Sequence, residues 1–149
     1  MIYTDSIAEN GLIAALSDAE KTVFLRTVLY MSKLDGQVDE DEVNFIKKVV
    51  KKFKIANPQD IFATKTEDEI IEDLAVISER RTALELIKEL CMLGHADNDL
   101  SDEEVLFIGH VGKALDISIK KIEEISNWVI DYVIWLEQGK IIFEDEEND

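Results

Sequence analysis

Four carboxylates at matched spacing are the side chains of this chain best suited to chemistry. Asp35 and Glu42 lie seven residues apart, and Asp97 and Glu104 repeat that spacing later in the sequence. Carboxylate oxygens are the ligands that hard divalent cations prefer. If the two segments face each other, the four side chains can share one cation that offsets their mutual repulsion. We name these four as candidate metal ligands, and the secondary candidates are Asp39, Asp99 and Ser101.

The same four residues also have a purely structural explanation. Glu42 and Glu104 can each close a capping box at the start of a helix. Asp35 and Asp97 can accept amide hydrogens within the turns that precede those helices. Two interpretations therefore stay open, namely a divalent cation held between the two segments, or helix caps and turns alone.

No catalytic residue can be assigned from the sequence. Cys91 and His95 are four residues apart and would lie on one side of a helix, a spacing that can bind zinc or pair a thiol with a base. A second cysteine and an obvious third ligand are missing, so we expect a buried structural cysteine beside a turn histidine. His110, set among apolar residues, is also expected to be structural. We predict that the chain is not an enzyme.

An internal repeat contains the four carboxylates. The shift that places Asp35 on Asp97 also places segment 33–46 on segment 95–108, and the apolar residues on both flanks match as well. Each copy reads as helix, acidic turn, helix, so residues 21–54 and 83–116 are expected to form two similar helical hairpins. The identical pairs are Asp35/Asp97, Glu42/Glu104, Val43/Val105, Phe45/Phe107 and Ile46/Ile108.

Helix-start signals and apolar spacing predict the elements around this repeat. Ser17 with Glu20 and Ser101 with Glu104 form capping boxes. Further starts are expected at Asp39, Asn57-Pro58, Thr66, Ser78 and Ser118, and the last helix is expected to stop near Gly139. We find no strand pattern. The expected fold is all-α, with about seven helices in a single domain over residues 1–143 and an acidic tail over 144–149.

The last expected helix differs from the others in composition. Residues 128–136 are apolar on every side apart from Asp131, and they include Trp128, Tyr132 and Trp135. A helix of this kind is buried in a core or covered by a partner. We expect burial within the monomer, and the alternative is an interface with a protein partner or with a second copy in a homodimer.

Charge and composition exclude several classes of function. The net charge of −17 repels phosphate backbones, so nucleic-acid binding is not expected. The single cysteine suits a reducing compartment. The chain start lacks the pattern of a signal peptide, and no apolar run is long enough to cross a membrane. We therefore expect a cytoplasmic protein without direct membrane insertion.

The two acidic turns resemble those of the TerB-like family, which is named for a tellurite-resistance protein. The matching segments are 34–42 and 96–104, with Arg80-Arg81 opening the helix before the second turn. The resemblance covers about residues 17–118. It implies an all-helical fold with internal pseudo-symmetry, a link to tellurite and other stress responses, and an acidic cluster that binds metal ions. The positions that match this cluster are Asp35, Glu42, Asp97 and Glu104.

Two functions follow as hypotheses. The first is a non-enzymatic stress-response domain that binds a divalent metal ion through the repeated Asp/Glu motif. The second is a protein–protein interaction module that uses its acidic face or its Trp-rich C-terminal helix and needs no metal.

Overall fold

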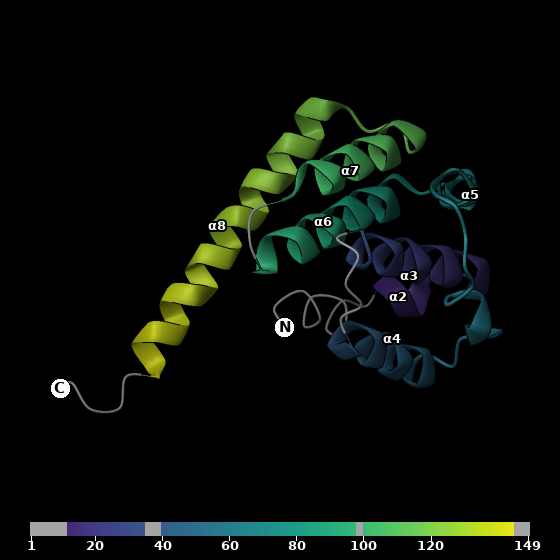
Figure 1. Cartoon of the computed structure of the whole chain (residues 1–149), viewed down its shortest axis with the longest axis horizontal. Coiled ribbons are helices and arrows are strands. Elements are labelled where there is room, and N and C mark those ends of the chain that lie inside the picture. The colour runs from purple at the N-terminus through teal and green to yellow at the C-terminus, as the bar shows by residue number, and fades with distance from the viewer. Residues whose placement is uncertain (1–11, 35–39, 98–99, 145–149) are drawn as a thin grey trace.

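The structure is a computed structural model, and every regular element in the described part of the chain is a helix (Figure 1). It describes the backbone of residues 12–34, 40–97 and 100–144, and the side chains of these residues except 12–13, 41–42 and 96–97. No strand occurs within these ranges. The predicted all-α class is therefore confirmed.

The α-helices follow one another in chain order with short connections. They are α2 (Leu12–Ala15), α3 (Asp18–Ser32), α4 (Glu40–Lys52), α5 (Glu67–Asp73), α6 (Arg80–Asp97), α7 (Asp102–Ala114) and α8 (Ile119–Phe143). Two short 3₁₀ helices, η1 (Pro58–Asp60) and η2 (Leu74–Val76), lie before and after α5.

Side-chain caps fix where several helices begin. Ser17, Thr66 and Ser101 each accept a hydrogen bond from the amide three residues later, and a glutamate there accepts one from the cap amide. Ser118 caps α8 with a single bond. These predicted starts are confirmed. The start predicted at Ser78 is wrong, because α6 begins at Arg80.

Two other sequence predictions about helix ends need correction. Asn57 precedes η1 as expected, but its φ is 52° and its side chain makes no capping bond. The last helix does not stop near Gly139, because α8 continues to Phe143. A single glycine costs an exposed helix only about 1 kcal/mol, which the apolar residues around it offset.

The core forms around α3 and α6. Helix α6 packs against α3 on one side and against α7 and α8 on the other. The side chains that are fully buried or nearly so include Phe24, Leu25, Leu86, Ile87, Leu90 and Phe107. Figure 1 shows α3 and α6 in the middle of the molecule, with α4 and α5 at its edges.

The repeat read from the sequence has a structural counterpart where α4 and α7 end. Lys54 and Asp116 are paired by the shift that aligns the two copies, and both are in the left-handed conformation, with φ of 51° and 57°. The following amides, of Ile55 and Ile117, donate to the carbonyls of Val50 and Gly112 at 3.1 and 2.7 Å. This bond to a carbonyl one turn back is the Schellman pattern of a helix C-terminus. Both segments therefore end in the same way.

Helix α8 reaches past the rest of the molecule. Its 25 residues make it about 37 Å long, whereas the 13 residues of α7 span about 20 Å. The N-terminal half of α8 packs on α6 and α7, and Val129 is completely buried there. The C-terminal half extends away from the helical body (Figure 1).

Candidate functional site

The described residues contain only part of the predicted carboxylate site, so the metal site stays a prediction. Asp35 lies outside the described residues, as do the side chains of Glu42 and Asp97. Glu104 is half-buried, and its Oε1 accepts a hydrogen bond from the Ser101 amide at 3.0 Å. The Glu104 amide in turn donates to the Ser101 hydroxyl at 3.2 Å. Glu104 therefore acts as a helix cap, as one of the two interpretations expected.

The secondary candidates divide in the same way. Ser101 is the N-cap of α7, and Asp39 and Asp99 lie outside the described residues. Among the side chains that the structure describes, no three His, Cys, Asp or Glu residues come close enough to hold a metal ion. His110 is paired with a glutamate, since its Nδ1 lies 3.2 Å from an Oε2 atom of Glu67.

Cys91 and His95 both face Ser126 of α8. The His95 Nε2 lies 3.0 Å from the Ser126 hydroxyl. Cys91 is fully buried, which raises the pKa of its thiol to about 12, although a hydrogen bond with Ser126 acts to lower it. A thiol with this pKa is a poor nucleophile at neutral pH. The pair therefore connects α6 to α8, in agreement with the structural interpretation.

The aromatic side chains of α8 form an exposed ladder. The Trp128 and Tyr132 rings stack at 5.7 Å between centroids, and the Tyr132 and Trp135 rings at 6.4 Å. Trp128 is nevertheless 57% exposed and Trp135 is 66% exposed. Beyond them, Ile141, Ile142 and Phe143 are also exposed. Expected burial of these tryptophans within the monomer is therefore wrong.

The reason for this error is geometric. Apolar composition shows that a helix must be covered, but it does not show how far the helical body reaches along the helix. Helix α8 is longer than the surface formed by α6 and α7, so Trp135 lies in the half that extends beyond them, whereas Trp128 lies beside the buried Val129 but on another face of the helix. An exposed apolar surface of this extent is typical of an interaction site.

Three exposed residues, Trp128, Trp135 and Ile142, share one stripe of α8 with residues that are half-buried. Intervals of three and four residues separate the members of one stripe, which is the arrangement of the core positions of a heptad. We call this stripe the α8 seam, and it consists of Ile125, Trp128, Tyr132, Trp135, Gly139 and Ile142. Its spacing is visible in the sequence, but composition alone marks these residues only as part of a helix that is apolar on all sides.

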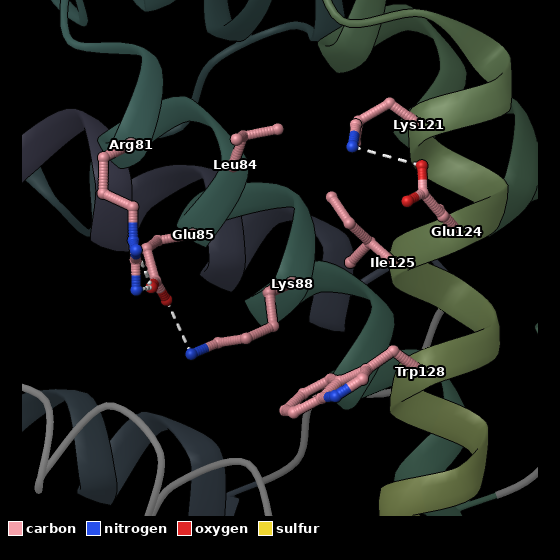
Figure 2. A pocket seen from close by; sticks show the side chains of 8 residues that line it. All are labelled: Arg81, Leu84, Glu85, Lys88, Lys121, Glu124, Ile125 and Trp128. Carbon is pink, nitrogen blue, oxygen red and sulfur yellow. Dashed lines mark hydrogen bonds and ion pairs between the residues drawn. The ribbon is translucent and has the colours of Figure 1, made fainter.

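A groove lies between α6 and the first part of the α8 seam. It has a volume of about 500 Å³ and is lined by Arg81, Leu84, Glu85, Lys88, Lys121, Glu124, Ile125 and Trp128. Figure 2 shows the Trp128 ring at one end of the groove, with the α6 side chains opposite. Leu84, Ile125 and Trp128 make an apolar surface that charged side chains surround.

Ion pairs hold the charged side chains of the groove. Glu85 lies 2.8 Å from Arg81 and 2.6 Å from Lys88, and Lys121 lies 3.1 Å from Glu124 (Figure 2). Burial acts to raise the pKa of Glu85, but the bonds and charges of Lys88 and Arg81 outweigh it and lower that pKa. The lining has three cations and two carboxylates, and the buried Glu89 lies 3.7 Å from Lys88, so each cation of the groove already has a carboxylate partner.

The groove and seam are suited to binding rather than to bond-making chemistry. Their side chains supply aromatic surface, aliphatic surface and cations that are already paired. This combination can accept an apolar segment that ends in negative charge.

Comparisons with known proteins give no relative. No family model, curated protein or solved structure matches this chain. Within the described part of the chain, no helix is both long and apolar enough to cross a membrane.

Proposed function

We propose that this chain is a non-enzymatic protein-interaction module that docks a partner through α8. The observation that carries the proposal is the exposure of Trp128 and Trp135 on a seam with heptad spacing. Tryptophan and tyrosine dominate the binding energy of many protein interfaces. Leaving two tryptophans in water is unfavourable for an isolated chain, and a partner that covers them would offset this cost.

Photo-crosslinking from α8 tests this proposal. A benzophenone amino acid replaces the exposed Gln138, which flanks the α8 seam, and the full chain is expressed in its native cells. Irradiation should give discrete crosslinked species, and a W128S/W135S variant should lose them. The control places the same crosslinker at Lys47, an exposed position on α4. If position 138 gives no species beyond those of position 47, the interaction role of α8 is wrong.

The divalent-cation function is the second proposal, and it rests on the repeat. The matched ends of α4 and α7 support the idea that residues 21–54 and 83–116 are two copies of one TerB-like hairpin. Two such copies would bring Asp35, Glu42, Asp97 and Glu104 into comparable settings. Glu104 uses Oε1 for its cap, which leaves its second carboxylate oxygen for a cation. A stress-response role follows only from the family resemblance.

A further inference from the structure

We propose that a second copy of this chain occupies the groove and seam, with the two α8 helices antiparallel. This inference rests on the proposed interaction role of α8 and names its partner. In the pair, the C-terminal end of each α8, with the acidic residues that follow it, lies in the α6–α8 groove of the other copy.

The residues of the α8 seam favour the antiparallel direction. In an antiparallel coiled coil, each first core position of one heptad faces the second core position of the partner helix. The resulting pairs are Ile125 with Ile142, Trp128 with Gly139, and Tyr132 with Trp135. Trp128, the bulkiest residue of the seam, thus faces Gly139, which has no side chain. A Cβ added at Gly139 would meet nothing within 4 Å, so this position has room for the Trp128 ring of the other copy.

A parallel pair would match size poorly. In a parallel, in-register coiled coil each core residue faces its own copy. Trp128 would then face Trp128, and Gly139 would face Gly139, which crowds one layer of the seam and leaves another unfilled.

The groove matches the C-terminal segment of the chain in chemistry. Ile141, Ile142 and Phe143 are exposed, and Phe143 is 87% exposed. These residues suit the apolar surface of Leu84 and Trp128. Residues 144–149 follow them and contain five carboxylates, which suit the three cations of the groove (Figure 2). An apolar segment followed by negative charge meets an apolar surface bordered by three cations and the carboxylates that pair with them.

The segment cannot fill the groove of its own chain. Ile125 and Phe143 lie on one continuous helix, and the rise between them is about 27 Å. The six residues after Phe143 span at most about 21 Å when fully extended. A second copy is therefore needed to bring residues 144–149 to the groove.

The antiparallel arrangement also limits repulsion between two chains of net charge −17. Each helical body lies beside the N-terminal half of its own α8, so an antiparallel pair offsets the two bodies along the paired helices. Charges farther apart than about 8–10 Å are largely screened at physiological salt. The close contacts are those between opposite charges in the groove.

Sedimentation velocity of the full chain tests the pairing. The parent should reach twice the 17.0 kDa mass of one chain within the concentration range to about 100 µM. G139L should raise the dimer Kd about a hundredfold because its side chain occupies the space needed by Trp128. W128A should also weaken the dimer. The double variant W128A/G139L should recover to within about tenfold of the parent, because the new leucine fills the space left by the ring.

Two further variants separate the seam from general properties of the chain. I142E, within the seam, should abolish dimerisation, whereas I134E, at an exposed position on another face of α8, should leave the Kd unchanged. Changing the five carboxylates of 144–149 to amides should weaken the dimer about tenfold. General repulsion predicts the opposite sign for this last variant, because the change removes five negative charges from each copy.

The possible results decide between the models. A parent that stays monomeric throughout this range overturns the second-copy inference, and crosslinks from position 138 to a different protein would still support the interaction role. A dimer that G139L and I142E do not affect overturns pairing through α8. A dimer that the double variant does not restore overturns the antiparallel register.

Discussion

Lys54 and Asp116 end two different helices in the same left-handed backbone conformation, although neither residue is glycine. A non-glycine residue in this region is strained by contact between its Cβ and the backbone. The two strained positions coincide under the shift that aligns the sequence repeat. Each copy of the repeat therefore stops its second helix with the same turn and at the same energetic cost.

Glycine at either position should stabilise the protein. We expect K54G and D116G each to raise the free energy of unfolding by up to about 1 kcal/mol, because relief of Cβ strain exceeds the added entropy of the unfolded chain. Urea unfolding measures the change. K54A and D116A are the matched controls and should not raise the free energy of unfolding. Equal stability of the glycine and alanine variants would show that Cβ strain at these two positions is absent.

A partly buried ion pair between α3 and α5 should matter more than the surface pairs. Arg26 is largely buried, and its guanidinium donates to Asp73 at 2.8 Å and to the Asp60 carbonyl at 2.9 Å. D73A leaves this buried cation without its carboxylate and should cost about 2–3 kcal/mol of unfolding free energy. K121A, at the exposed pair with Glu124, should cost less than about 1 kcal/mol. Comparable losses in thermal and urea unfolding would refute this ranking.

Glu85 should contribute to the loss of stability in acid. Its pKa is lower in the folded state than the usual glutamate value, so the folded chain releases this proton more readily than the unfolded chain. Its contribution is present above the unfolded pKa of about 4.3 and is lost as the pH falls through the lower folded pKa. The difference in stability between the parent and E85Q should shrink from pH 6 to about pH 3. A constant difference across this range would show that the ionised form is not favoured.

A divalent cation should stabilise the parent if the four repeated carboxylates share it. At a concentration one hundred times its Kd, a cation adds about 2.7 kcal/mol through linkage, and the melting temperature rises. D35N/D97N should remove this response while keeping the turn chemistry. D102N/E103Q removes the same number of charges from exposed positions and should keep it. If calcium, magnesium, manganese and zinc at millimolar levels leave the parent melting curve unchanged, the metal site is wrong and the four carboxylates serve only as helix caps and turn acceptors.

Local signals predicted the helix starts well because each depends on a few neighbouring residues. Ser17, Thr66 and Ser101 each reach an amide three residues away, and this geometry is nearly independent of the rest of the fold. The left-handed ends at Lys54 and Asp116 could not be predicted in this way. Glycine is the usual sign of such an end, and neither position has it.

The candidate site was harder to predict because it depends on distance along the fold. Sequence showed that Trp128 and Trp135 need cover, but the extent of α6 and α7, and the face of α8 that they contact, decide whether their own chain supplies it. The groove forms because Arg81 of α6 and Lys121 of α8 line the same space. These two helices are separated in the sequence by the whole of α7. The charges of Arg81 and Lys121 were visible from the start, whereas their proximity follows only from the packing of α6 on α8.

Anchoring along its N-terminal half also gives α8 the mechanics of a lever. Within α8, all of which the structure describes, Val129 is the residue that is fully buried, and Phe143 lies about 21 Å farther along the helix. A tilt of about 10° at the anchor would move the far end by about 4 Å. In the proposed dimer, the side chains that pack around Val129 therefore set the spacing and angle between the two helical bodies. Substitutions of such side chains that do not contact the other copy can change the geometry of the dimer while its contact residues stay intact.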